Sequence, residues 1–185
     1  MKTTKQKFAI GLLAVLLIIT VYTGLIKPYI KNKDTGHINS NASSEEVRIP
    51  NFQFADREGN TVDFDSFRGK PTVINFWGTW CGFCVMEMRD FNEVVEEYGD
   101  DVNFLFLHVA NSADTTVESV LSFLSERELD NITTHFDDYG HGTYVFGINS
   151  FPTTVYADAE GNLYNAKLGL TNKDQVTKVL DEMLG

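Results

Sequence analysis

Two cysteines, placed between segments of opposite character, limit the possible folds of this chain more than any other feature. Cys81 and Cys84 are the only cysteines in 185 residues. They follow the run PTVINFW (residues 71–77), which is typical of a buried strand. They precede a segment in which apolar side chains recur every three or four residues. The sequence therefore predicts a strand, a C-x-x-C motif and an amphipathic helix in direct succession.

Strand and helix patterns continue to alternate along the rest of the chain. Asp, Gly and Asn residues at 56–60 and at 158–162 separate alternating apolar residues and predict two hairpins. This order predicts an α/β fold with a mixed central sheet and helices on both faces. The other expected elements are a strand at residues 102–110, a helix that opens with a capping box at Thr115 and Glu118, a short strand at 132–136 and a helix from Thr171.

The first 46 residues differ in composition from the rest of the chain. A basic segment at residues 1–7 precedes residues 8–26, which contain no charged side chain and could span most of the ~30 Å hydrocarbon core of a bilayer. A cleaved signal peptide is the alternative, but no suitable small-x-small cleavage site follows the apolar run. We therefore expect a transmembrane anchor at residues 8–26, a flexible linker at 27–46 and a globular domain at 47–185.

The expected globular part is strongly acidic. From residue 45 to residue 185 it carries nine Lys and Arg side chains against 25 Asp and Glu side chains, which gives a net charge of −16. Such a surface is repelled by nucleic acids and by anionic lipids, so neither is an expected partner of the domain. The charge is typical of a solubilising surface, and a face that selects basic partners is the alternative.

A C-x-x-C motif has three common uses, and one of them explains this position. A zinc site needs a second pair of Cys or His ligands at short spacing, whereas His108, His135 and His141 are scattered along the chain. A structural disulfide that closes so short a loop adds little stability. At the start of a helix, unpaired N–H groups and the helix dipole lower the pKa of a thiol, and this predicts a redox-active dithiol.

The order of the two cysteines along the helix suggests their roles. Cys81 stands at the helix start and is expected to be the exposed nucleophile. Cys84 lies one turn further on the apolar stripe, so it is expected to be more buried and to act as the resolving thiol. In disulfide exchange, Cys81 would attack a partner disulfide, and Cys84 would then release the partner by forming a Cys81–Cys84 disulfide.

Three stretches of the chain resemble the membrane-anchored, extracytoplasmic thioredoxin-like proteins of the TlpA/ResA type. The stretches are ADREGNTVDFDSFRGKPTVINFW (residues 55–77), NFWGTWCGFC (75–84) and INSFPTTVYADAEGNLYNAKLG (148–169). The resemblance covers nearly all of residues 47–185. It implies a thioredoxin fold with an N-terminal β-hairpin and a central helix-strand insertion. It also implies a thiol-disulfide oxidoreductase that acts on protein substrates.

The resemblance further implies roles for residues that match the motifs of this family. Pro152 is expected to follow a cis peptide bond and to face the dithiol, which would leave the Phe151 backbone free to pair with an extended substrate. A trans proline at the start of a strand is the alternative. Trp80 is expected to line the redox surface because it stands beside Cys81. The residues expected to bind substrate are Phe151 and Thr153, on either side of Pro152, and Phe83, an apolar ring between the two cysteines.

Two departures from the family pattern affect the expected chemistry. Phe83 stands where many relatives have proline. Gly82 and Asn75 occupy positions where ResA-like proteins and thioredoxins, respectively, carry a carboxylate that can accept the proton of the resolving thiol. Glu87, one turn after Cys84, is the nearest remaining acid. It falls among the polar positions of the helix, a pattern that favours a solvent-exposed surface glutamate.

The anchor, the linker and the resemblance together suggest a domain outside the cytoplasmic membrane, attached through residues 8–26. The expected partners are protein disulfides or thiols and a membrane electron donor, and no cofactor or metal is expected. Relatives include reductants, some of them in cytochrome c maturation, and a few oxidants. We therefore expect a reductase, with a thiol oxidase as the alternative. An alternative of another class is a Cu(I) or Zn chaperone that adds His135 or His141 to the two cysteines.

Overall fold

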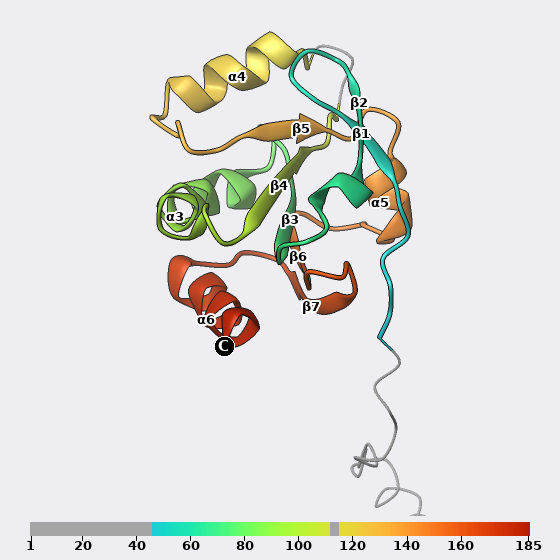
Figure 1. The fold of residues 1–185 in the computed structure, drawn as a ribbon. Helices are drawn as coiled ribbons and strands as arrows, with labels where there is room; N and C mark the ends of the chain where they lie inside the picture. Colours follow the sequence, from blue (N-terminus) through green and yellow to red (C-terminus); the bar gives the residue numbers. More distant parts are fainter. Residues whose placement is uncertain (1–45, 112–114) are drawn as a thin grey trace, which may run out of the picture. The chain divides into compact units, whose positions relative to one another are not determined.

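The computed structural model describes residues 46–111 and 115–185, which form the domain drawn in colour in Figure 1. The basic segment expected at residues 1–7, the anchor expected at 8–26 and all but the last residue of the linker expected at 27–46 lie outside the described residues. Among the residues that are described, no helix is both long enough and apolar enough to cross a membrane.

Within the described residues, seven strands form one mixed sheet in the order β2-β1-β5-β4-β3-β6-β7. The central strand β3 pairs in parallel with β4 and antiparallel with β6, which confirms the mixed central sheet predicted from the sequence. The strands span β1 (Gln53–Ala55), β2 (Thr61–Asp63), β3 (Thr72–Trp77), β4 (Asn103–His108), β5 (Thr134–Phe136), β6 (Thr153–Ala157) and β7 (Leu163–Leu168).

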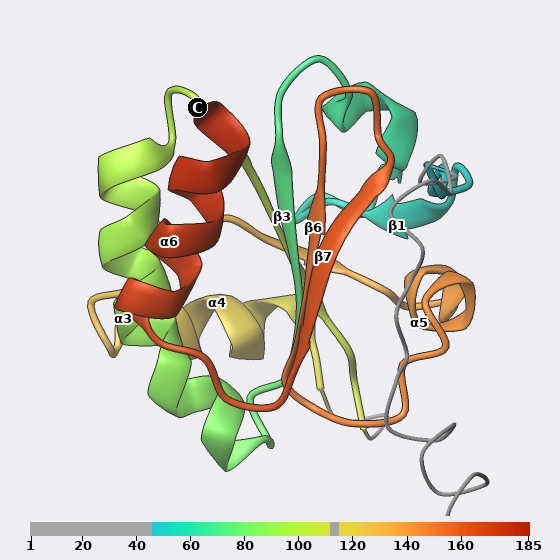
Figure 2. The ribbon, with the colours of Figure 1, turned by 90° about the horizontal axis from the view of Figure 1, so that it is seen from below.

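Helices cover both faces of this sheet, as the sequence predicts. Three longer helices, α3 (Gly82–Tyr98), α4 (Val117–Ser125) and α6 (Lys173–Leu184), lie on one face. The short helix α5 (His141–Val145) and the 3₁₀ turn η2 (Phe64–Phe67) lie on the other face (Figures 1 and 2). The sequence pattern does not predict α5 or η2, because so few residues cannot display a helical period.

Two helices begin slightly later than the sequence predicts. The N-cap of α4 is Thr116, whose hydroxyl accepts a hydrogen bond from the N–H of Ser119 at 3.2 Å. The Ser119 hydroxyl closes the capping box, so the box expected to start at Thr115 is wrong by one residue. Asn172 caps α6, one residue after Thr171, near which the sequence predicts the start of this helix. Both differences arise because neighbouring Ser, Thr and Asn residues are all good caps, and only the folded chain selects between them.

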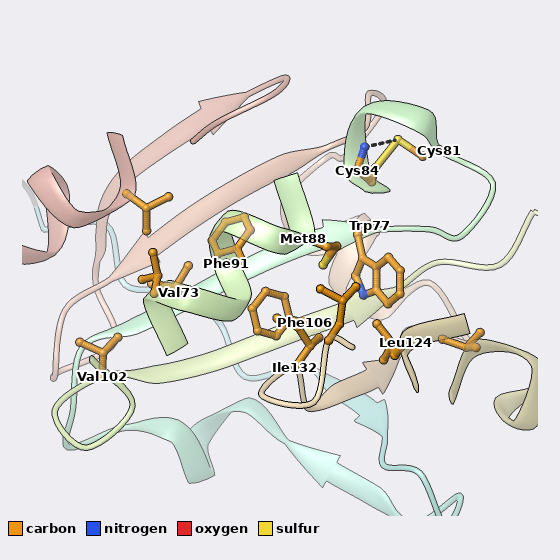
Figure 3. Close-up of a cluster of buried hydrophobic side chains, with 14 of the residues drawn as sticks. Val73, Trp77, Cys81, Cys84, Met88, Phe91, Val102, Phe106, Leu124 and Ile132 are labelled. Atoms are coloured by element: carbon orange, nitrogen blue, oxygen red, sulfur yellow. Dashed lines mark hydrogen bonds between the residues drawn. A yellow bond between two sulfur atoms is a disulfide. The ribbon is translucent and has the colours of Figure 1, made fainter. Parts of the chain in front are cut away.

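The core consists of two layers, one on each face of β3. All six residues of β3 are buried, and successive side chains point to opposite faces. Ile74 and Phe76 pack in the layer on the side of α5. Val73 and Trp77 pack in the layer on the side of α3, α4 and α6, which also contains the two cysteines. Figure 3 shows this second layer, with the cysteines at one end of it.

The described chain enters the domain at the end of the sheet that is remote from the two cysteines. Arg48 forms an isolated bridge with Asn162, in the turn between β6 and β7. Figure 2 shows this turn and the start of α3 at opposite ends of the sheet. Arg68 stabilises the end of the domain that contains this turn. Its guanidinium donates hydrogen bonds to the carbonyl of Ile49 at 3.1 Å and to the carbonyl of Glu160 at 2.8 Å. One side chain thus links the incoming segment to the β6–β7 turn.

Replacing Arg68 with alanine is expected to lower the free energy of unfolding by about 1–3 kcal/mol, because two backbone carbonyls lose a charged donor. Urea unfolding followed by circular dichroism measures the change. Arg89→Ala is the matched control, since Arg89 is exposed and makes no ion pair with another described residue. A loss for Arg68→Ala no larger than that of the control would show that the link adds no stability.

Candidate active site

The two cysteines lie at the junction between β3 and α3. The strand ends at Trp77 and the helix begins at Gly82, so a short loop turns the chain from the sheet into the helix. Cys81 is the N-cap of α3, and its sulfur accepts a hydrogen bond from the N–H of Cys84 at 3.2 Å. The two sulfur atoms form a disulfide (Figure 3). The structure therefore shows the oxidised form of the pair.

Both cysteines are buried in this form. Cys81 keeps 7% of its surface exposed and Cys84 keeps 0%. Cys81 is more exposed than Cys84, as the sequence predicts. The prediction that Cys81 is an exposed residue is nevertheless wrong for the disulfide form. The reason is that Cys81 packs in the same core layer as Trp77. A partner sulfur can reach the pair only at the small exposed part of Cys81, because Cys84 presents no surface.

The N-terminus of α3 favours a thiolate at Cys81. The helix is 17 residues long, and its first turn contains no acidic side chain. Unpaired N–H groups and the helix dipole stabilise a negative charge at this end. The Cys84 N–H that bonds the Cys81 sulfur is one of these donors. After reduction, the same donor is positioned to stabilise a Cys81 thiolate.

The loop before β6 approaches the cysteines from the neighbouring strand. The Phe151–Pro152 peptide bond is cis, the conformation that the family resemblance implies. The Phe151 ring contacts the Trp80 indole, with ring centroids 5.1 Å apart, so the loop lies beside the residue that precedes Cys81. Within the described residues, the Phe151 backbone makes no hydrogen bond to another backbone group. Its N–H and carbonyl are therefore available to an extended partner chain.

Thr153 differs from the other residues expected to bind substrate, because its side chain is buried. Thr153 pairs with Phe76 of β3, and its hydroxyl donates a hydrogen bond to the carbonyl of Ser150 at 2.9 Å. The side chain therefore shapes the loop that carries Pro152 and does not present itself to solvent. Any contact of Thr153 with a substrate would have to come from its backbone.

Three large apolar side chains remain exposed near the cysteines. The exposed fraction is 42% for Trp80, 62% for Phe83 and 63% for Met86. The Trp80 indole is held by a 2.8 Å hydrogen bond to the carbonyl of Val109. Sequence reasoning selected Trp80 and Phe83 but missed Met86, although its spacing of three residues from Phe83 makes the two neighbours on the helix. An exposed apolar surface beside a buried disulfide suits contact with a protein partner.

His108 supports the loop that leads to Cys81. Its imidazole is buried and packs edge-on against Trp77. The Nε2 atom accepts a hydrogen bond from the N–H of Thr79 at 3.4 Å. Desolvation lowers the pKa of His108 to about 4, so the ring is neutral near pH 7 and can act as this acceptor. These contacts support the interpretation of His108 as a structural residue.

Glu87 is buried, and the prediction of a solvent-exposed glutamate is wrong. The residue has 1% of its surface exposed. The Nδ2 atom of Asn75 donates to Oε1 of Glu87 at 2.8 Å, and the N–H of Thr171 donates to Oε2 at 2.9 Å. Burial raises the pKa of Glu87 to about 7, against the lowering effect of both hydrogen bonds. A carboxyl that titrates near neutrality therefore lies one helical turn from Cys84.

The helical period of α3 could not reveal this burial. The side of the helix that carries Glu87 is covered by a segment 84 positions later in the chain, whose Thr171 N–H bonds the carboxylate. Figure 2 shows α6 and the preceding connection lying against α3. The available signal was Asn75, an amide in the middle of a buried strand. Because a buried amide needs a polar partner, Asn75 pointed to a polar residue on the element that packs over β3.

The histidines do not join the cysteines in one site. His135 packs against the rings of Phe54 and Phe67, on the face of the sheet opposite to α3. His141 begins α5 on that same face. In the part of the chain that the structure describes, no group of three or more His, Cys, Asp or Glu side chains is arranged to hold a metal ion. The metal-chaperone alternative therefore lacks a third ligand among these residues.

Comparisons with known proteins agree with this geometry. The chain matches the model of the Redoxin family over residues 44–184. A curated relative, the thiol-disulfide oxidoreductase ResA of Bacillus thuringiensis, is 27% identical over 183 residues, and the match covers 99% of each chain. The match therefore spans the positions of the cysteine pair, of the loop that carries Pro152 and of most of the segment before the described domain.

Two solved structures illustrate the similarity in fold. The exposed lipoprotein thioredoxin Etrx1 of Streptococcus pneumoniae has a TM-score of 0.62 and 25% identity, and the match covers 72% of this chain and 99% of Etrx1. A thiol:disulfide interchange protein of the thioredoxin family from Chlorobium tepidum has a TM-score of 0.66 and 21% identity, with 78% and 100% coverage. The second likeness concerns the fold alone. The thioredoxin-like fold expected from the sequence is confirmed.

Glu87→Gln is expected to change how stability depends on pH. The folded-state pKa of Glu87 is about 7 against an ordinary value of 4.5. The carboxyl therefore favours the folded state below pH 4.5, and this contribution is lost as the pH rises through 7. Relative to the variant, the wild-type protein should lose about 3 kcal/mol of unfolding free energy over this range. Urea unfolding of both proteins at a series of pH values measures the difference.

Glu96→Gln provides the control for this prediction. Glu96 lies on the same helix but is exposed, and it forms no ion pair with a described residue. The difference in unfolding free energy between Glu96→Gln and the wild-type protein should change little with pH. If the Glu87→Gln difference were equally flat, the Glu87 carboxyl would have an ordinary pKa in the folded protein.

Proposed function

This chain belongs to the Redoxin family and is a thiol-disulfide oxidoreductase of the TlpA/ResA type, and we propose that it reduces protein disulfides outside the cytoplasmic membrane. The proposal depends on the position of Cys81. This residue caps α3 and is joined to Cys84, and the preceding residue, Trp80, contacts the ring of Phe151, which the cis bond joins to Pro152. A partner sulfur can therefore meet Cys81 while the partner backbone pairs with Phe151.

The proposed reaction transfers two electrons from the reduced pair to a substrate disulfide. The Cys81 thiolate attacks one substrate sulfur, a Cys81–substrate bond forms, and the other substrate sulfur leaves as a thiolate. Cys84 then loses its proton and attacks the Cys81 sulfur. The Cys81–Cys84 disulfide forms and the second substrate sulfur leaves as a thiolate. The substrate gains two electrons and the pair loses two, which gives the oxidised form that the structure shows.

Glu87 is the proposed acceptor of the proton that Cys84 loses. Both residues are buried, and they lie one turn apart on α3. Water cannot readily take the proton at a site with no exposed surface, so a nearby base is needed. A carboxyl with a pKa of about 7 can hold or release a proton at neutral pH, which is the property of an efficient general base.

The proposed location rests on the sequence and on the relatives. Residues 8–26 form an uncharged apolar run, and the polar residues 27–46 separate it from the domain. Two cysteines that both serve in the reaction, and no others, suit an exported protein. The similar Etrx1 is named as an exposed lipoprotein. In this setting a membrane donor returns electrons to the pair, and apocytochrome c disulfides are one class of substrate.

The roles of the cysteines are tested by Cys81→Ser and Cys84→Ser. The first variant should lose reduction of insulin, because it lacks the nucleophile. The second should form the first mixed disulfide and retain it, because it lacks the resolving thiol. Insulin turbidity and non-reducing electrophoresis measure these outcomes. Ser122→Ala, on the exposed surface of α4, is the control and should behave as the wild-type protein. Equal residual activity in the two cysteine variants would contradict the assigned roles.

The proposed direction is tested by the equilibrium reduction potential of the pair. A reductant should have a potential near that of thioredoxin, roughly −270 mV. The fluorescence of Trp80, which lies beside the pair, can report its redox state in glutathione or dithiothreitol buffers. A potential near roughly −120 mV, typical of strong oxidants, would reject the reductase and support the thiol oxidase.

A further inference from the structure

The buried carboxylate of Glu87 meets a buried amide instead of a cation. Asn75 lies within β3 with 0% of its surface exposed, and its Nδ2 atom donates to Oε1 of Glu87 at 2.8 Å. The second N–H of this amide donates to the Thr154 hydroxyl at 3.1 Å, from the paired position on β6. Among the described residues, no Lys, Arg or His side chain donates a hydrogen bond to the Glu87 carboxyl.

The donors around Glu87 match the ionised form of its side chain. Oε1 accepts from Asn75, and Oε2 accepts from the N–H of Thr171. Both partners are donors in this arrangement, so a proton on either oxygen would displace one of them unless the Asn75 amide turned to offer its Oδ1 atom, which has no partner among the described residues. These hydrogen bonds hold the carboxylate, while burial favours the protonated acid. Asn75 therefore influences the balance between the two forms.

We propose that Asn75 is a positioning residue for Glu87. The pair requires one carboxyl and one amide, and either of the two positions can carry the carboxyl. The inference rests on the proposed role of Glu87 as proton acceptor. Asn75 fixes the carboxyl through one N–H, and Thr154 fixes Asn75 by accepting the other. Without the Asn75 donor, the buried carboxylate loses one of its two hydrogen bonds and should retain a proton to higher pH.

The contacts also permit the carboxyl and the amide to change places. Asn and Asp have nearly the same shape, as do Gln and Glu. In the double variant N75D/E87Q, the amide on α3 can donate to the carboxylate on β3, and its oxygen can still accept from the N–H of Thr171. The Thr154 hydroxyl, an acceptor in the wild-type protein, can turn and donate to the carboxylate. The groups that bond one another in the wild-type network therefore keep partners after the exchange, while the position of the Asn75 Oδ1 atom, which has no partner among the described residues, stays without one.

Few other titratable groups influence the site. Asp90, further along α3, raises the pKa of Glu87 through its charge. Burial raises the pKa of Tyr156 of β6 to about 12, and the charge of Glu87 adds a smaller contribution. Lys173 of α6 directs its ammonium group to exposed carboxylates of α3. The cysteines do not titrate while they form the disulfide. A measurement on the oxidised protein therefore reports mainly on the contact between Glu87 and Asn75.

The first experiment follows the Glu87 carboxyl by carbon-13 NMR as a function of pH, in the oxidised full chain in detergent micelles. Asn75→Leu should raise the titration midpoint by about one to two pH units, the expected effect of losing one hydrogen bond to a charged group. Thr134→Val is the matched control, because Thr134 is a buried polar residue that bonds Trp77 instead of Glu87. Its midpoint should equal that of the wild-type protein. An unchanged midpoint in Asn75→Leu would overturn the inference.

The second experiment does not depend on the folding of Asn75→Leu. It compares the pH profile of insulin reduction for the wild-type protein, E87Q and N75D/E87Q. E87Q should lose the inflection that Glu87 contributes near neutral pH, while the dependence on the Cys81 thiolate is common to all three proteins. N75D/E87Q should regain the lost inflection because it again contains one buried carboxyl. A double variant that fails to fold, or whose profile equals that of E87Q, would overturn the claim that the two positions are interchangeable.

The two measurements separate this inference from the proposed function. The NMR midpoint depends on the hydrogen bond between Asn75 and Glu87 and requires no redox reaction. A raised midpoint in Asn75→Leu, together with normal insulin reduction by E87Q, would retain Asn75 as a positioning residue and remove Glu87 from the proposed reaction. An unchanged midpoint with slow reduction by E87Q would retain the reaction and reject the role of Asn75.

Discussion

The domain depends on one strand that is buried on both faces and leads directly to the reactive pair. Packing on two sides fixes the position and register of β3, because a shift by one residue would exchange its two core faces. A short loop after this strand brings Cys81 to the tip of α3. The cis-Pro loop begins the adjacent strand β6. The geometry of the sulfur chemistry is therefore set by the core, although the reaction takes place at its edge.

The same burial gives a pair of polar side chains in this layer a large desolvation cost. Asn75 and Glu87 lose contact with water, and the hydrogen bonds that they share with Thr154 and Thr171 offset only part of this loss. The consequence is a carboxyl whose affinity for a proton is much higher than that of a surface glutamate. Here, as at many reactive sites, a group that destabilises the folded chain at neutral pH has the acidity that the chemistry requires.

Features that depend on nearby residues follow from the sequence, and features that depend on distant contacts do not. The switch of period after residues 71–77 predicts the strand, the loop and the helix, and it places Cys81 at the helix cap. The burial of Glu87 depends on Thr171, which lies 84 positions later in the chain. The low exposure of Cys81 likewise depends on the assembled layer around Trp77. The cis bond before Pro152 came from the family resemblance, because no local pattern distinguishes it from a trans bond.

Both described ends of the domain lie away from the helix tip that carries the cysteines. The segment around Arg48 pairs with the β6–β7 turn, and α6 carries the chain from the reactive edge back toward the same end (Figure 2). A fluorescent protein, an affinity handle or a solid support joined at either end would therefore leave the catalytic edge open to a bulky macromolecule. This geometry makes the domain suitable for oriented immobilisation, in which every molecule presents its dithiol to the bulk solution.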